Sequence, residues 1–161
     1  MKQKCLLLLA LAFTLVTVNA QTKVTKTNIV SNWVITAVDA SPAFKYDVDK
    51  DSLSLGEAIK SQVKPEQESM VLGMMKQQVG VFKKMAFKFN ADGTAELNSG
   101  VPGTGATKAT YTVDEANSTI TTVEAEGDKV KETIKADFVN SNLRLVLEQP
   151  TGNIILLLKK G

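Results

Sequence analysis

Histidine is absent from this sequence, and its single cysteine, Cys5, lies near the N-terminus. Nucleophilic sites of the Ser-His-Asp and Cys-His types use histidine as the general base, and most zinc sites use histidine and cysteine ligands. Both kinds of site are therefore excluded. Catalysis would have to depend on paired carboxylates or on a lysine in unusual surroundings, and no motif marks either. We expect no catalytic residue, no metal site and no cofactor.

Three aspartates alternate along one short segment, at Asp47, Asp49 and Asp51. Calcium loops of the EF-hand type begin in this way, but they continue with glycine at the sixth position and glutamate at the twelfth. Here those positions hold Ser52 and Ala58. The pattern favours an acidic loop that caps the following helix, and weak calcium binding is the alternative.

Four methionines lie close together in the sequence, at Met70, Met74, Met75 and Met85. Thioethers are soft ligands that suit Cu(I), but no histidine or nearby cysteine supports such a site. Methionine in an amphipathic helix more often fills gaps in a core. A lid over an apolar ligand, formed by Met74, Met75 and the following Phe82, is an intermediate interpretation.

Glu132 falls on the same face of a predicted strand as Val130 and Ile134. A carboxylate directed into an apolar interior is costly unless it is paired. Glu132 therefore either anchors the polar head of a ligand or lies at a rim that water reaches. A local bulge that turns the side chain outward would have the same effect as a rim position.

A few aromatic residues fall on the apolar faces of predicted strands. They are Trp33, Phe87, Phe89 and Tyr111. The simplest interpretation is that they form the core. In a small barrel, however, core positions and ligand-lining positions are the same, and only the unfilled volume distinguishes them.

The elements that position these residues follow from hydrophobic periodicity. Residues 29–38 have apolar side chains at every second position, including Trp33, Ile35 and Ala37, which predicts a strand. A helical insertion is predicted over about 52–83, because Ser54 and Glu57 have capping-box spacing and Pro65 suits the first turn of a second helix. Apolar residues then recur at helical spacing up to Phe82.

From Lys84 onward the period is two, and it stays so to the C-terminus. Turn signals, such as Asp92-Gly93, separate short alternating segments. The sequence thus predicts about eight strands, seven of them consecutive. A meander of this length commonly closes on itself, because closure removes exposed strand edges. We expect a mainly β fold, a single eight-stranded antiparallel up-and-down barrel with the helical insertion between its first two strands.

Several segments resemble those of bacterial secreted lipocalin-like domains. They are Asn32-Trp-Val-Ile35, the segment from Phe87 to Ala95 with its Asp-Gly hairpin, Tyr111-Thr-Val113 and Leu143-Arg-Leu145. The resemblance covers roughly residues 29–38 and 84–160. The sequence departs from the family where Asn32 replaces the usual glycine before the tryptophan, in the long insertion, and in the lack of a terminal helix. The resemblance implies a barrel that holds a small apolar molecule.

The N-terminal segment predicts export. Lys2 and Lys4 precede an apolar run from Leu6 to Val18, and the run is followed by the small residue Ala20 at the predicted cleavage point. This is the pattern of a secretory signal peptide, so we expect cleavage after residue 20 and one domain over 21–161, located in the periplasm or outside the cell. An uncleaved anchor is the alternative, and an intact mass beginning at Gln21 would decide between them.

Charge argues against two classes of partner. The chain has 19 Lys and Arg against 17 Asp and Glu, and the loss of Lys2 and Lys4 would leave 17 of each. Nucleic-acid binders and membrane-surface proteins carry a basic excess, and no second apolar run is long enough to span a bilayer. We therefore expect no nucleic acid and no transmembrane segment after cleavage.

The sequence thus favours an exported, non-enzymatic, lipocalin-like protein that binds a small lipophilic or amphipathic ligand inside the barrel. The candidate ligand-binding residues are Trp33, Met74, Met75, Phe82, Phe87, Phe89, Tyr111 and Glu132. The alternative is a barrel with a filled interior that acts through its outer surface, as an envelope or protein-interaction module such as an inhibitor. A third hypothesis is an enzyme that works with two carboxylates. The cavity volume distinguishes the first two.

Overall fold

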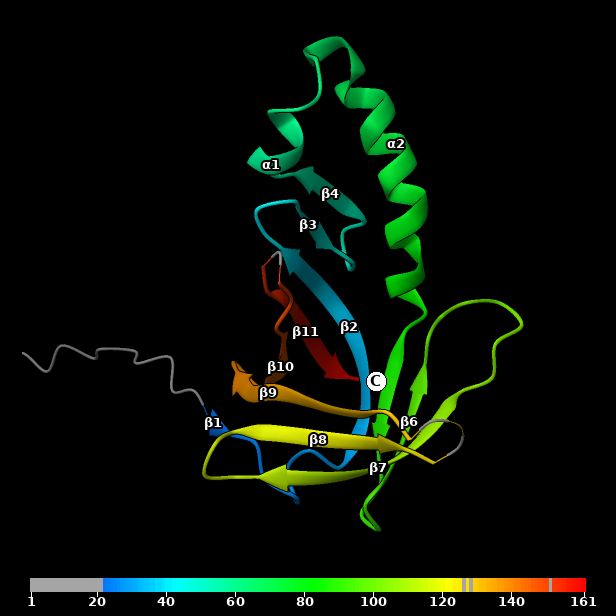
Figure 1. Ribbon diagram of the computed structural model, residues 1–161, viewed down its shortest axis with the longest axis vertical. Coiled ribbons are helices and arrows are strands. Elements are labelled where there is room, and N and C mark those ends of the chain that lie inside the picture. The colour runs from blue at the N-terminus through cyan, green and yellow to red at the C-terminus, as the bar shows by residue number, and fades with distance from the viewer. Residues whose placement is uncertain (1–21, 126, 128, 151) are drawn as a thin grey trace, which may run out of the picture.

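A closed barrel of eight antiparallel strands forms the body of the protein in the computed structural model (Figure 1). The structure describes residues 22–125, 127, 129–150 and 152–161. The barrel strands are β2 (Ser31–Ala40), β5 (Ala86–Phe89), β6 (Thr94–Asn98), β7 (Thr107–Asp114), β8 (Thr119–Glu124), β9 (Lys131–Val139), β10 (Asn142–Leu147) and β11 (Ile154–Lys160). Each pairs with its neighbour along the chain, and β11 closes the barrel against β2. The predicted mainly β barrel fold is confirmed.

Short connections hold this meander in register. The turn between β5 and β6 has Gly93 at a φ of +86°, and the Asn90 amide donates to the Thr94 carbonyl at 2.9 Å. Only glycine adopts such a φ without a steric cost, so the predicted Asp-Gly hairpin forms where the sequence placed it. Along every strand, successive side chains then point alternately into the barrel and outward.

A β-bulge in β2 changes which residues of that strand face inward. Leu157 of β11 lies opposite Ala37, while the next residue, Leu158, lies opposite Ile35, so Thr36 is the extra residue. The Thr36 hydroxyl donates to the Leu157 carbonyl at 3.0 Å. Beyond the bulge Val38 is buried and Ala37 is only half-buried. The expected alternation of Trp33, Ile35 and Ala37 on one face is therefore wrong at its last residue.

An extension continues β2 beyond the region where β5 pairs with it. The hairpin formed by β3 (Phe44–Asp47) and β4 (Ser52–Leu55) adds to the outer half of β2. This segment was expected to be a connection and the start of a helix. Ser54 lies in β4, and Gly56 caps the first helix without a side-chain hydrogen bond. The helical part of the insertion consequently begins at Glu57 and not near residue 52.

The helices of the insertion stand at one end of the molecule, away from β7 and β8 (Figure 1). They are α1 (Glu57–Lys60), the 3₁₀ turn η1 (Pro65–Gln67), α2 (Glu68–Val79) and the 3₁₀ turn η2 (Gly80–Lys83). Pro65 begins η1, as predicted. α2 packs against β4, and η2 packs against β2. The insertion therefore covers the sheet extension.

Most of the barrel is filled by apolar side chains. The residues that lose almost all solvent contact include Trp33, Ile120, Leu143, Leu145 and Leu158. A two-residue strand, β1 (Thr22–Lys23), pairs with β9 beyond the point where β8 pairs with it. The lead-in that follows β1 places Val24 and Ile29 in the same core.

No helix in the described part of the chain has the length and apolar character needed to cross a bilayer. The signal peptide predicted over residues 1–20, with Cys5 inside it, lies outside the described residues. Export therefore stays a prediction from sequence.

Asp51 joins the sheet extension to the helical insertion. Its carboxylate accepts a hydrogen bond from the Tyr46 hydroxyl at 2.8 Å and forms salt bridges with Lys83 at 2.8 Å and Lys76 at 3.0 Å. Lys83, Tyr46 and Lys76 together hold the pKa of this carboxyl well below its usual range. The charged form is thus favoured by the folded state, and its stabilising effect is lost as the pH falls through the lowered pKa.

We expect Asp51→Asn to lower the melting temperature and to loosen α2. Asn tolerates the positive φ of this position, so the substitution removes the charge and keeps the backbone. The difference in Tm between wild type and variant should be constant above about pH 5 and shrink below about pH 4, where the carboxyl begins to protonate in the unfolded chain. Thermal unfolding across this range measures it. A difference that grows on acidification would contradict the assignment.

Candidate functional site

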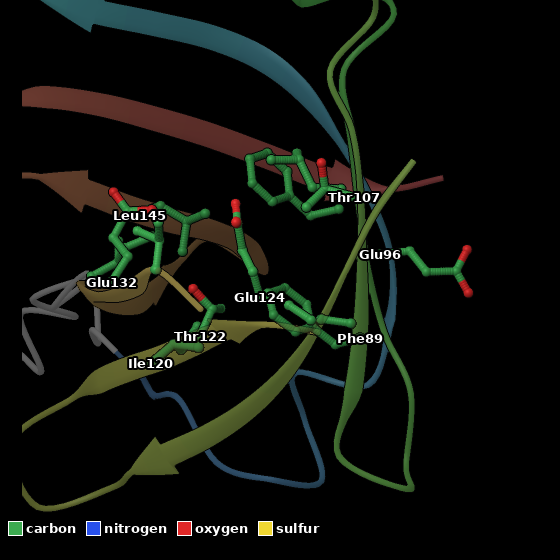
Figure 2. A pocket seen from close by; sticks show the side chains of 14 residues that line it. Phe89, Glu96, Thr107, Ile120, Thr122, Glu124, Glu132 and Leu145 are labelled. Carbon is green, nitrogen blue, oxygen red and sulfur yellow. The ribbon is translucent and has the colours of Figure 1, made fainter. Parts of the chain in front are cut away.

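An apolar pocket opens inside the barrel, among β5, β6, β7, β8, β9 and β10 (Figure 2). Its volume is about 110 Å³. The lining residues are Phe87, Phe89, Ala95, Glu96, Leu97, Thr107, Ala109, Ile120, Thr122, Glu124, Val130, Glu132, Ile134 and Leu145. Most of them are apolar.

Two small residues create the unfilled space. Ala95 of β6 and Ala109 of β7 lie directly opposite each other in the ladder. The residues around them on the inward face are larger. Phe89 of β5 lies opposite Ala95, and Tyr111 is the next inward residue after Ala109 in β7. Barrel interiors are otherwise packed to the density of crystals. Where two methyl groups meet in place of two large side chains, a gap remains.

The floor of the pocket is the filled part of the core. Phe89 packs edge-on against Tyr111, with ring centroids 5.0 Å apart. Trp33 does not line the pocket but lies opposite Phe87, which does. It is fully buried, its ring centroid is 5.6 Å from that of Phe138, and its Nε1 donates to the Ile29 carbonyl at 2.7 Å. The space is therefore bounded on one side by the packed core.

Two carboxylates lie at the mouth of the pocket. Glu132 of β9 is opposite Thr122 of β8 in the ladder, and Glu124 lies two residues farther along β8. The alternation of side chains turns both toward the interior. Figure 2 shows the carboxylates of Glu124 and Glu132 beside the cavity, with that of Glu96 directed away from it. Glu96 faces Lys88 instead, at 3.7 Å.

Both carboxylates of this pair lack a cationic partner among the described residues. Among the residues that the structure describes, Glu124 and Glu132 form no salt bridge and no side-chain hydrogen bond. Glu132 is exposed, and Glu124 is half-buried. Of the two positions foreseen for Glu132, the structure shows the one at a rim that water reaches. That position also leaves the carboxylate free to meet a ligand.

Three of the eight candidate residues line the pocket, namely Phe87, Phe89 and Glu132. Trp33 and Tyr111 belong to the core around it, and the Tyr111 hydroxyl donates to the Asn90 carbonyl at 2.8 Å. Both share one interior with Phe87 and Phe89, as expected.

The three remaining candidates lie on the insertion, away from the pocket. Met74 is 53% exposed, and Met75 and Phe82 are half-buried. No described residue of the insertion is among the lining residues. The insertion nevertheless borders the same interior as the aromatic residues, because Val79 belongs to the core cluster and Phe82 packs against it. It does not line the pocket.

Sequence reasoning missed Ala95, Ala109 and Glu124. Glu124 was left out because the strand was expected to end at Val123, whereas β8 includes it. Ile120, Thr122 and Glu124 are spaced two residues apart and therefore share one face of the strand. Extending the predicted strand by one residue would have placed Glu124 on the inward face. The two alanines could be found only by aligning β6 with β7, which the loop between them obscures.

The alternating aspartates are each used by a different lysine. Asp47 pairs with Lys50 at 2.6 Å and Asp49 with Lys159 at 2.8 Å, while Asp51 joins the lysines of the insertion. No group of three metal-ligating side chains occurs in the described part of the chain. The three carboxylates lie at the turn that joins β3 to β4, so the expectation of an acidic loop that caps a following helix is wrong, because a strand follows this segment.

Comparison with known proteins returned no relative. No family model, no curated protein and no solved structure matches this chain. The lipocalin-like family resemblance therefore stays a hypothesis, and function has to be argued from the pocket.

Proposed function

We propose that this protein is an exported, non-enzymatic carrier or sensor that binds a small apolar or amphipathic molecule in the barrel pocket. The observation that supports this most directly is the open cavity between Ala95, Ala109 and Phe89 in an otherwise filled interior. Apolar surface that remains open to solvent inside a barrel is where a ligand gains most from leaving water.

The pocket volume restricts the size of the ligand. A cavity of roughly 150 Å³ in another protein accepts benzene, and this one has about 110 Å³ and is open on one side. A single aromatic ring or a short alkyl chain fits, with the rest of the molecule outside. This is smaller than the pocket of several hundred Å³ that a lipid carrier would have. For a neutral probe we expect affinity on the order of millimolar, since association costs offset most of the burial gain.

Burial argues against an acid–base enzyme. A catalytic carboxylic acid is kept protonated by apolar, water-poor surroundings. Glu132 is exposed and Glu124 is half-buried at the mouth, so neither has such surroundings.

Substitution of Ala109 by leucine should abolish probe binding. The added methylenes would occupy the gap opposite Ala95, which is where we place the ring of the ligand. Filling an existing cavity leaves the fold intact and stabilises rather than unfolds it. Titration with benzyl alcohol, followed by the backbone amide shifts of residues 95–97 and 107–109 in NMR spectra, measures binding. Unchanged shifts on titration of Ala109→Leu are the expected result.

Thr112→Val is the matched control, because Thr112 is exposed on the outer face of the same strand. It should bind as wild type does. If wild type itself shows no shift at these amides with any small apolar probe, the pocket does not bind ligands. The protein would then act through its outer surface, as the filled-barrel hypothesis holds.

A further inference from the structure

We propose that the pocket selects molecules in which a protonated amine follows a short apolar group. The inference rests on the proposed function and adds the chemical class of the ligand. It combines the apolar cavity with the positions of Glu124 and Glu132, which the structure places at the cavity mouth.

The inward direction of both glutamates is not needed for folding. Glu132 shares its face of β9 with Ile134, Ala136 and Phe138, which all contribute to the interior. A threonine or valine at this position would suit a strand better than glutamate does. Residues that oppose the local pattern tend to occur where function requires them. Two such residues line this apolar pocket.

The strand register brings the two carboxylates to the same ligand head group. Glu132 and Glu124 are diagonal neighbours across the β8–β9 ladder, a relation that sets their Cβ atoms somewhat less than about 7–8 Å apart. One ammonium group has three donors and no acceptor, so it can lie between two carboxylates at this spacing. The hydroxyl-bearing Thr122 lies opposite Glu132 and adds an acceptor on the same side.

Among the described residues, no lysine or arginine forms a salt bridge with either carboxylate, although Lys108 lines a neighbouring hollow together with Glu124. Lys131 precedes Glu132 but faces outward, because adjacent residues alternate across the sheet. Lys135 is engaged on the outer surface by Glu148 at 2.6 Å. The two carboxylates therefore attract an ammonium group and repel a ligand with a carboxylate head.

Three probes with similar apolar parts test the charge preference. They are 2-phenylethylamine, 2-phenylethanol and 3-phenylpropionate, titrated by NMR at low ionic strength. We expect the amine to bind about ten-fold more tightly than the alcohol, since two partly exposed charge contacts contribute on this scale. The carboxylate should bind most weakly. The advantage of the amine should fall as salt is added, because salt screens exposed charges.

The double variant Glu124→Gln/Glu132→Gln identifies the source of the preference. We expect the ratio of amine to alcohol affinity to fall to near one. Glu115→Gln/Glu148→Gln is the matched control, since it removes two charges at exposed positions outside the pocket. This control should keep the ratio. Equal loss in both double variants would mean that only net charge matters, and it would overturn the inference.

The outcomes separate the two proposals. If the alcohol binds and the amine binds no better, the amine preference is wrong and the apolar pocket stands. If the alcohol and the amine both fail to bind, the proposed function is wrong as well. Calcium chloride provides a last comparison: if calcium ions at equal ionic strength displace the amine far better than magnesium or sodium ions do, the carboxylates form a metal site and the inference fails.

Discussion

Replacing Trp33 by alanine is expected to destabilise the protein by about 3–5 kcal/mol, the range for removal of a large aromatic residue from a packed core. Trp33 has no exposed surface, its ring contacts that of Phe138, and its Nε1 donates to the Ile29 carbonyl. The ring thereby attaches the segment between β1 and β2 to the core of the barrel. The cavity left behind would adjoin the ring of Phe138.

Urea unfolding followed by far-UV circular dichroism measures this loss, because the variant lacks the only tryptophan of the chain. Trp33→Phe is the matched control. It keeps most of the apolar volume but leaves the Ile29 carbonyl without its donor, which costs about 1–3 kcal/mol. The alanine variant should therefore be clearly less stable than the phenylalanine variant. Equal stability of the two would show that the hydrogen bond, and not the packing of the ring, makes the larger contribution.

The role of Trp33 also affects how ligand binding can be observed. The sequence interpretation placed Trp33 among the ligand-binding residues, which predicts a fluorescence change when a probe binds. The structure separates it from the pocket lining, although Phe87, directly opposite it in the ladder, belongs to that lining. Trp33 fluorescence is consequently a suitable signal for unfolding, whereas binding is better followed at the amides of β6 and β7.

The barrel could be predicted because its signals are local. Alternation from Phe87 through Leu145 and turn residues such as Asp92-Gly93 repeat along consecutive strands, and each strand pairs with the next. The β3–β4 hairpin could not be predicted in this way. Its inward residue Tyr46 is surrounded by charged and polar neighbours, and Leu53 and Leu55 read equally well as the start of a helix. Pairing with the outer half of β2 decides between strand and helix, and that contact is not local.

The pocket was predicted only in part for the same reason. Large residues on apolar faces, such as Phe87 and Phe89, can be recognised in a sequence. An empty space cannot, because it depends on which small residues meet across strands. Ala95 and Ala109 have ordinary surroundings in the sequence, and only the register of β6 with β7 brings them together. The alternating pattern of its strand predicted that Glu132 faces inward. Glu124 was missed because it lies one residue past the expected end of its strand.

The connection between β6 and β7 depends on Gly100, and we expect Gly100→Ala to cost about 2–5 kcal/mol. Its φ is +73°, a conformation that costs an alanine about 1–2 kcal/mol. A Cβ here would lie 2.5 Å from the Val81 carbonyl oxygen and 3.1 Å from the Lys84 Cβ. Neither neighbour can move without its backbone, so overpacking adds about 1–3 kcal/mol. Gly100 thus lets the loop approach the end of the helical insertion.

Gly103→Ala separates the two contributions. Gly103 has a similar φ of +84°, but a Cβ there would meet no atom within 4 Å. This variant should lose only the conformational part, about 1–2 kcal/mol. The difference between the two variants in urea unfolding measures how tightly the loop packs on η2. Because this loop leaves the barrel at the pocket mouth, Gly100→Ala should also weaken probe binding more than Gly103→Ala does. Equal effects of the two substitutions on stability would show that the loop does not depend on its contact with the insertion.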